Sequence, residues 1–318
     1  MMKVIDSIRK ADRPLFTFEL LPPRKGGKID HLFDTVSELM EFEPSYINVT
    51  YHQHEIEYRE RPDGLMEKKV IQKRPGTISI STALHNKFKI PVVPHLICGG
   101  FTREETEDAL IDLNFLGFQN ILALRGDPVS GQKSFKPEPG GHAHANELVE
   151  QIVKMNRGEY LNPSLKNTKA SDFSIGVAGY PEKHYESPNM EMDIHWLKHK
   201  VDAGAEYIVT QMFFDNSKYF RFVERCRQEG IDVPIIPGLK PISTFKDIDL
   251  IPRAFHIDIP NELCKEVSKC DNKEQVRQVG VEWTTRQALE LKQYGVPALH
   301  FFTLGQSDNI RKIASQVF

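Results

Sequence analysis

Residues 92–124 read VVPHLICGGFTREETEDALIDLNFLGFQNILAL and contain the structural unit that decides the fold. Two apolar runs, Val92–Ile97 and Asn120–Leu124, predict buried strands. Between them, Thr102 and Glu105 have the spacing of a helical capping box. The helix that follows has an apolar face formed by Leu110, Leu113 and Leu116. A strand, a helix and a second strand in this order favour parallel pairing through a right-handed crossover.

The same alternation extends to both sides of this unit. Further strands are predicted at Leu15–Leu20, Tyr46–Thr50, Phe173–Gly179, Tyr207–Gln211, Val233–Pro237 and Ala298–Thr303. Amphipathic helices are predicted over residues 190–203 and 273–294, and another begins at Asp215. Eight strands that alternate with helices in 318 residues favour a single-domain (β/α)8 TIM barrel over residues 1–318. An open, doubly wound α/β sheet would give a similar pattern and stays an alternative.

The composition is that of a globular protein. Apolar residues make up 40% of the chain and charged residues 27%, which argues against disorder. Lys and Arg (41) nearly balance Asp and Glu (44), so the net charge of −3 gives no positive field for nucleic acid or anionic lipid. We find no signal peptide and no membrane-length apolar run, and therefore expect a cytoplasmic protein. The four cysteines never form a C-x-x-C pair, so neither a disulfide framework nor a zinc ribbon is predicted.

Two predicted connections are unusually long. Residues 52–89 include the charged stretch EKKVIQKR, and residues 126–146 are rich in glycine and proline. Loops of this length in a compact domain are usually functional or disordered. Both follow strands, so a barrel would place them at its carboxyl-terminal face, where active sites are built. The sequence alone assigns them no role.

Polar side chains stand at the predicted carboxyl ends of the strands. Glu19 lies in the apolar run FTFELLPP, where burial would raise its carboxyl pKa and suit it to general-acid catalysis. A salt-bridged or exposed glutamate is the alternative. Arg125-Gly126-Asp127 can place charge and backbone N–H groups beside a ligand, although an ordinary solvated turn has the same pattern. Gln211 ends a strand within apolar sequence, so its amide requires a partner.

A predicted helix carries further polar candidates. Asp193 and Lys200 are seven residues apart and share one face of it, with Trp196 between them; the pattern alone indicates a solvated charged stripe. His195 and His199 have the spacing of a metal chelate but lack the glutamate of a zinc protease motif, so we interpret them as surface residues. No metal site is predicted. The chain also lacks a G-x-G-x-x-G fingerprint, a P-loop and a G-x-S-x-G elbow.

The joint order and spacing of several segments resemble one known family. These segments are FTFELLPPR, YINVTY, VPHLIC, NILALRGDP, GVAGYPEKH, LKHKVDAGAEYIVTQMFFD, GIDVPIIPGLKPIS and LHFFTL. They span Phe16 to about Leu304 and are similar to the methylenetetrahydrofolate reductases. The resemblance implies a (β/α)8 barrel that binds FAD and uses NADH or NADPH. It further implies ping-pong reduction of 5,10-methylenetetrahydrofolate to 5-methyltetrahydrofolate, which feeds methionine synthesis.

The resemblance also implies roles for individual residues. Glu19 would be the general acid, and Asp127 would tune the flavin and the folate. The positions similar to FAD contacts of the family are Thr50, Tyr51, His95, Arg125, Gly126, Asp127, Ala145, Tyr180, His184, Asp193 and Lys200. The folate and the nicotinamide would contact Glu19, Asp127, Gln211 and Gln306. Small molecules are the expected partners, together with further copies of the chain in a dimer or tetramer.

The chain departs from the family pattern at several positions. Gln306 stands where the family has an arginine, and Asp247 and Ile251 stand where it has glutamine and phenylalanine. His144 replaces the usual aromatic residue before Ala145. Because the chain ends soon after the predicted barrel, we expect no regulatory domain and no inhibition by S-adenosylmethionine. No motif distinguishes NADH from NADPH.

Two other functions remain open from the sequence. One is a flavin-free lyase or methyltransferase built on the same barrel. The other is a flavin- or folate-binding regulator without turnover. A bound flavin would exclude the first, and only turnover would exclude the second.

Overall fold

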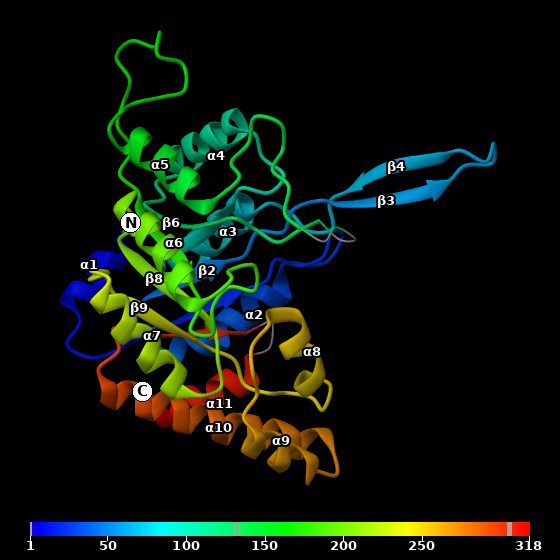
Figure 1. Cartoon of the computed structure of the whole chain (residues 1–318), viewed down its shortest axis with the longest axis vertical. Helices are drawn as coiled ribbons and strands as arrows, with labels where there is room; N and C mark the ends of the chain where they lie inside the picture. The colour runs from blue at the N-terminus through cyan, green and yellow to red at the C-terminus, as the bar shows by residue number, and fades with distance from the viewer. Residues whose placement is uncertain (1, 130–131, 133, 304–306) are drawn as a thin grey trace.

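Eight parallel strands close into a barrel within residues 2–129, 132, 134–303 and 307–318, which are those that this computed structural model describes (Figure 1). The strands are β1 (Leu15–Leu20), β2 (Tyr46–Val49), β5 (Val92–Ile97), β6 (Asn120–Leu124), β7 (Ser174–Gly179), β8 (Tyr207–Met212), β9 (Ile235–Leu239) and β10 (Ala298–Phe302). Neighbours in the barrel follow chain order, and β1 pairs with both β2 and β10. The predicted (β/α)8 barrel is confirmed, and the open sheet is wrong.

The barrel closes through the pairing of its first and last strands. Leu15 lies opposite Ala298, and Glu19 lies opposite Phe302. On its other side Glu19 lies opposite Asn48 of β2. This register brings the carboxyl end of β1 level with the carboxyl ends of its neighbours, so polar side chains at those ends share one face of the molecule.

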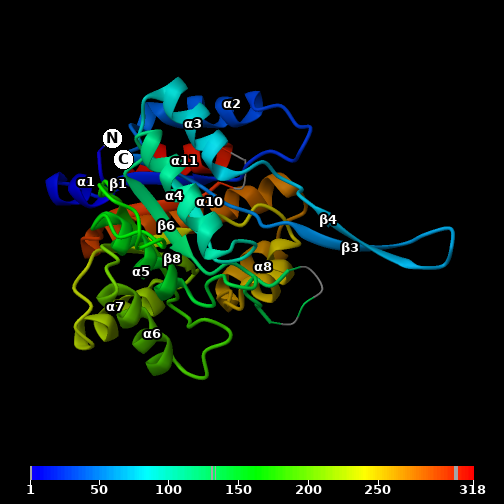
Figure 2. The same ribbon diagram turned by 90° about the horizontal axis from the view of Figure 1, so that it is seen from above.

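Helices surround the barrel (Figure 2). They are α1 (Val4–Lys10), α2 (Asp30–Leu39), the 3-10 turn η1 (Met40–Phe42), α3 (Thr77–Phe88), α4 (Arg103–Phe115), α5 (Ala145–Asn156), α6 (Met190–Asp202), α7 (Asn216–Gln228), α8 (Asp247–Phe255), α9 (Asn261–Ser268), α10 (Lys273–Tyr294) and α11 (Asp308–Val317). The predicted capping box is present, because Glu105 N donates to Thr102 Oγ1 at 3.2 Å and Thr102 N donates to Glu105 Oε2 at 2.8 Å. Leu116 is 46% exposed, since the helix ends one residue before it; its predicted burial is wrong.

The described residues form three hydrophobic clusters, of which a small one packs α8, α9 and α10 beside the barrel. A large cluster lies between the strands and the surrounding helices, and a smaller one fills the interior of the barrel. Val4 of α1 belongs to the inner cluster, and its backbone N–H donates to Asn120 Oδ1 at 2.8 Å. Towards the opposite end, the buried polar side chains of Thr17, Asn48 and His300 lie on the strands. The interior is therefore apolar near α1 and polar towards the carboxyl-terminal face.

The long connection over residues 52–89 contains a hairpin that the sequence analysis missed. Its strands are β3 (Glu55–Glu60) and β4 (Met66–Ile71), which pair only with each other. In Figures 1 and 2 this light-blue hairpin extends away from the barrel. The intervening residues RPDGL supply the proline, aspartate and glycine of a turn.

The other long connection is held against two helices. The Nε2 atom of buried His142 lies 2.5 Å from Gln151 Oε1 of α5. Gln151 in turn donates to the carbonyl of Arg103 at 2.9 Å, and Arg103 N donates to the carbonyl of Gly140 at 3.2 Å. These contacts tie residues 140–142 to the amino-terminal end of α4 and to α5.

Candidate active site

A cavity of about 480 Å³ lies at the carboxyl-terminal face of the barrel. It is bounded by residues that follow or end β1, β5, β6, β7 and β8. Eleven residues predicted from the sequence line it: Glu19, His95, Arg125, Gly126, Asp127, Ala145, Tyr180, His184, Asp193, Lys200 and Gln211. The fold therefore gathers in one place side chains that are far apart in the sequence.

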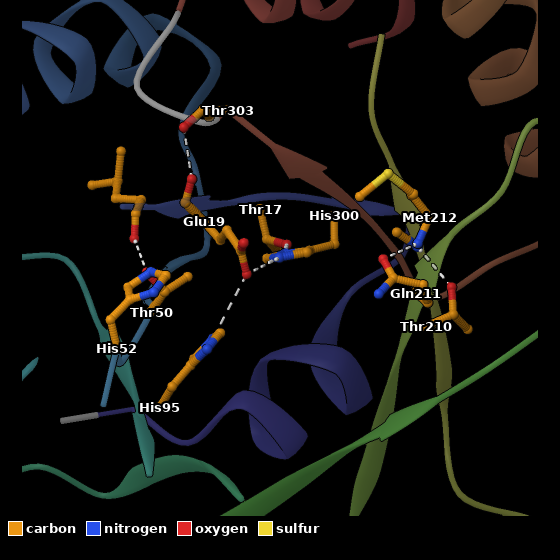
Figure 3. Close-up of polar contacts among 12 residues, drawn as sticks. Thr17, Glu19, Thr50, His52, His95, Thr210, Gln211, Met212, His300 and Thr303 are labelled. Atoms are coloured by element: carbon orange, nitrogen blue, oxygen red, sulfur yellow. Dashed lines mark hydrogen bonds and ion pairs between the residues drawn. The ribbon is translucent and has the colours of Figure 1, made fainter. Parts of the chain in front are cut away.

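Glu19 lies between two histidines at the barrel end of this cavity (Figure 3). Its Oε2 atom is 3.8 Å from His95 Nε2 and 3.9 Å from His300 Nε2. The glutamate side chain is 13% exposed, as expected for a carboxyl group in an apolar strand. The arrangement places a single carboxyl group between two imidazole rings.

The histidine nitrogens that face Glu19 are buried. Neither His95 Nε2 nor His300 Nε2 has a hydrogen-bond partner among the described residues. On the other side of its ring, His300 Nδ1 lies 2.7 Å from Thr17 Oγ1. Burial lowers the pKa of His95 to about 4 although Glu19 opposes the shift, so this ring is neutral near pH 7. Buried polar atoms without a protein partner usually meet a ligand or an ordered water.

The Arg125-Gly126-Asp127 turn forms one wall. Gly126 has φ +88°, and a Cβ there would lie 3.2 Å from Ile97 Cδ1, so glycine suits both the backbone and the space. The Arg125 guanidinium pairs with Glu186 and lies 5.0 Å from the centre of the Phe135 ring. Asp127 is exposed at the mouth of the cavity.

The loop after β7 forms the opposite wall, and Asp193 orders it. The Asp193 carboxylate accepts from His184 N at 3.1 Å and from Ser187 Oγ at 2.7 Å. His184 Nδ1 accepts from Glu186 N at 3.2 Å, so the ring proton resides on Nε2. Asp193 therefore positions the residues that line the cavity, besides lining it itself.

Lys200 contributes a buried ammonium group. Its Nζ atom donates to the carbonyl of Ala178 at 2.6 Å. Burial lowers the pKa of Lys200 to about 8, and the nearby Asp193 carboxylate opposes that shift. The charged stripe suggested by the pattern alone is wrong, because Asp193 is buried and both side chains line the cavity.

Gln211 is presented by an irregularity in the sheet. The register between β8 and β9 shifts between Val209 and Met212, as in a β-bulge. The Gln211 Oε1 atom accepts from Met212 N at 2.9 Å (Figure 3). The amide NH₂ group, which is a donor, is thereby left for a ligand in the cavity.

Two predicted site residues that the structure describes, Thr50 and Tyr51, are not in the cavity lining. Thr50 Oγ1 lies 3.3 Å from the Leu20 carbonyl and 3.3 Å from His52 Nε2. Tyr51 packs on Phe101 with ring centres 5.2 Å apart and lines a different groove. Gln306 falls outside the described residues.

The two unusual residues after β9 have structural contacts. Asp247 accepts from Ser243 N at 2.7 Å and lies 3.8 Å from Lys240 Nζ. Ile251 is buried in an apolar cluster. Neither belongs to the cavity lining.

Some residues in and beside the cavity were not predicted from the sequence. Glu186, Phe302 and Trp196 line the cavity, and His300 lies beneath Glu19. His300 is the polar residue of the run ALHFF, which is a usable signal, but its pairing with β1 requires the register. His144, noted as a departure from the family, lies parallel to Trp196 with ring centres 6.4 Å apart.

The described part of the chain has neither a membrane-spanning helix nor a metal-binding cluster. No helix in that part of the chain is both long and apolar enough to cross a membrane. No group of three or more His, Cys, Asp or Glu side chains there could hold a metal ion.

Comparison with known proteins identifies the family. Residues 3–317 match the family model for methylenetetrahydrofolate reductase. The chain is 33% identical to 5,10-methylenetetrahydrofolate reductase of Salmonella typhimurium over 293 residues, which cover 92% of this chain and 86% of that protein. It is 32% identical to methylenetetrahydrofolate reductase (NADH) 1 of Arabidopsis thaliana over 316 residues, or 95% of this chain and 48% of that protein. The chain thus spans about half the length of the plant relatives it matches.

A solved structure shares the fold at low sequence identity. It is a Clostridium thermocellum protein that binds two copies of 5-methyl-5,6,7,8-tetrahydrofolic acid, with a TM-score of 0.59 and 15% identity over 98% of this chain and 97% of that one. On the family match and the bacterial relatives, this chain belongs to the methylenetetrahydrofolate reductase family.

Proposed function

We propose that this chain reduces 5,10-methylenetetrahydrofolate to 5-methyltetrahydrofolate, with FAD as its cofactor and NADH or NADPH as reductant. Membership of the family supports this reaction. The observation that carries the proposal is Glu19, a nearly buried carboxyl group between His95 and His300 at the barrel end of the cavity.

The residues of the cavity fit FAD. A pyrophosphate requires cations, and Arg125 and Lys200 both line the cavity. Gly126 has no side chain, which allows the backbone to approach a flat ring closely. When bound, FAD supplies the hydride chemistry of the reaction. Asp193 and His184 would hold the same group from the opposite wall.

Glu19 would provide the proton that the reaction needs. Opening the five-membered ring of the substrate requires protonation at the folate N10 nitrogen, which a carboxylic acid can deliver directly or through one water. Because His95 is neutral near pH 7, it can accept a hydrogen bond from the acid form of Glu19. His300 would hold the carboxyl group in place while Thr17 holds the His300 ring.

Asp127 and Gln211 would act on the substrate itself. Ring opening leaves a cationic iminium on the folate, which a carboxylate stabilises electrostatically. Asp127 at the mouth can supply that charge, and the amide of Gln211 can donate to the pterin or to the carboxamide of the nicotinamide in turn.

An absorption spectrum of the purified protein tests this proposal first. We expect flavin bands that bleach on anaerobic addition of NADH or NADPH and return when methylenetetrahydrofolate is added. Comparing the two reductants determines which one the enzyme prefers. A colourless protein that takes up no added FAD would contradict the proposal, as would a reduced flavin that the folate cannot reoxidise.

A further inference from the structure

The two ends of the β3–β4 hairpin lie beside the candidate active site, although its strands extend away from the barrel (Figures 1 and 2). Before the hairpin, Gln53 Nε2 donates to the carbonyl of Asp127 at 2.5 Å, and Asp127 lines the cavity. After the hairpin, Gln72 Nε2 donates to the carbonyl of His52 at 3.5 Å. The root of the hairpin is therefore joined to the cavity wall.

The root also contacts the loop that follows β1. Lys25 N donates to the carbonyl of Lys73 at 2.7 Å, and the Arg74 guanidinium donates to the carbonyl of Pro22. Pro22 comes three residues after Glu19, so at most about 11 Å of chain separates them. These contacts place the Arg74 side chain at the end of the cavity that holds Glu19.

Positive charge gathers where these segments meet. We call this group the cationic rim; its members are Arg24, Lys25, Lys28, Lys73 and Arg74. Lys73 pairs with Glu55, whereas the other four have no ionic partner in the part of the chain that the structure describes. Burial lowers the pKa of Arg74, and the positive charge of Arg24 lowers it further. Like charges held this close favour an anionic ligand.

Negative charge lies directly inside the cationic rim. His52 lies beside Glu19, between the rim and the cavity (Figure 3). Burial and the positive charge of Arg74 lower the pKa of His52. The carboxylates of Glu19 and Asp127 oppose that shift, so groups of both signs act on this one ring. The site is thus acidic in the cavity and basic at its edge.

We propose that the cationic rim binds the glutamate carboxylates of the folate, with Arg24 and Arg74 as the residues that select for this tail. The inference rests on the proposed function. The substrate has the complementary charges, because a cationic iminium forms at its pterin end and its glutamate carries two carboxylates. Only a benzoyl group and an amide bond separate that glutamate from N10, which Glu19 would protonate. Guanidinium groups bind carboxylates through two parallel hydrogen bonds.

A substrate analogue without the tail tests this assignment. In the analogue, a neutral benzamide replaces the benzoylglutamate of 5,10-methylenetetrahydrofolate. The double substitution Arg24→Gln and Arg74→Gln should raise KM for the natural folate at least about tenfold, with a smaller effect on kcat. KM for the analogue should change little. Glutamine at position 74 keeps a donor for the Pro22 carbonyl, and circular dichroism establishes that the variant is folded.

Arg9→Gln and Lys10→Gln form the matched control. Both residues are exposed at the end of α1, which is at the opposite end of the barrel, and the pair removes the same charge. This control should keep the natural preference for the folate over the analogue. A preference that falls as far in the control would overturn the proposal, because net charge alone would then explain it.

Binding of the product gives a second readout that needs no turnover. Calorimetry with 5-methyltetrahydrofolate should show an affinity that falls as salt rises, and the double substitution should reduce this dependence. Equal losses for ligands with and without glutamate would overturn the proposal. So would weaker NADH binding with the folate preference intact, since the rim would then hold the dinucleotide phosphates. These results leave the proposed reaction standing, whereas a protein that takes up no FAD contradicts the reaction itself.

Discussion

The Nε2 atom of His300 lies 3.9 Å from Oε2 of Glu19, and Nδ1 of the same ring lies 2.7 Å from Thr17 Oγ1. One imidazole of β10 thus contacts two residues of β1. The His300 ring is fully buried, so its orientation is fixed by packing as well as by the hydroxyl. This fixed ring defines where the Glu19 carboxyl group can lie.

Substitution of the acid should separate the two half-reactions. Glu19→Gln keeps the size of the side chain but removes its transferable proton. We expect flavin binding and NAD(P)H oxidation to persist, while folate reduction falls by about 10²–10⁴-fold. Stopped-flow absorbance measures both steps on the same sample. Glu105→Gln, on the surface of α4, is the control. If Glu19→Gln reduced the folate at the natural rate, Glu19 would not be the general acid.

Loss of the His300 imidazole should misplace the acid without removing it. His300→Phe keeps a ring of similar size but contacts neither Thr17 Oγ1 nor the Glu19 carboxyl group through nitrogen. We expect folate reduction to slow by up to about 100-fold, with NAD(P)H oxidation nearly unchanged. The pH dependence of folate reduction by His300→Phe should change as well. A loss of stability alone would not change that dependence.

Tyr207→Phe provides a control inside the same barrel. Its buried hydroxyl has no hydrogen-bond partner among the described residues. We therefore expect Tyr207→Phe to keep both half-reactions. If it slowed folate reduction as much as His300→Phe does, a general disturbance of the barrel would explain both variants.

FAD affinity should fall in alkali because of Lys200. Burial lowers the pKa of Lys200 to about 8 from its ordinary 10.5, so the free site loses this positive charge as the pH rises through 8. We expect the dissociation constant for FAD, measured by fluorescence titration, to rise between pH 7 and pH 9. Lys200→Met should bind more weakly at pH 7 and lose this dependence. An unchanged pH dependence in Lys200→Met would exclude the lysine as its cause.

The lowered pKa of Lys200 should weaken FAD binding at alkaline pH but stabilise the folded chain there. Between about pH 8 and 10.5 the unfolded chain keeps a proton on Lys200 that the folded chain has released. The unfolded state therefore binds more protons in this window, and the contribution of Lys200 to the free energy of unfolding rises with pH. Urea titrations of the flavin-free protein and of Lys200→Met can isolate this contribution by difference.

Gly126 and Gly117 form a matched pair for testing the turn in the cavity wall. Both have left-handed backbone, with φ +88° and +81°, but a Cβ at Gly117 would meet nothing within 4 Å. Gly117→Ala should therefore show only the backbone cost, about 1–2 kcal/mol. Gly126→Ala adds the contact with Ile97, so we expect a larger fall in the free energy of unfolding together with weaker FAD binding. Equal falls in the free energy of unfolding of the two variants would show that the Ile97 side chain moves aside at no energetic cost.

The barrel was predictable because its signals are local. Each strand is an apolar run of a few residues, and the boundaries predicted for the strand at 120–124 and the helix at 273–294 match the structure. Residues at strand ends follow from the same reasoning, since every parallel strand delivers its carboxyl end to one face. Glu19, Arg125 and Gln211 could therefore be assigned to the cavity before any distance was known.

The remaining features depend on register and packing. The run ALHFF alone does not predict that His300 lies beside Glu19, because their proximity depends on the register between the last strand and the first. Tyr51 comes two residues after β2, yet its ring packs on Phe101 and is not part of the cavity lining. The hairpin was missed for a different reason: its turn signal was present in the sequence, but its charged strands lack the alternation of a half-buried sheet.

The candidate site can form only after β1 has paired with β10, the last strand of the barrel. A ribosome delivers Glu19 early and His300 late, so the acid cannot acquire its imidazole neighbour until nearly the whole chain has been made. Until then β1 has an unpaired edge, which is a template for association with other chains. Contacts between strands so distant in sequence form slowly. Synthesis of this chain therefore includes an interval in which the first strand needs protection and the candidate site is not yet assembled.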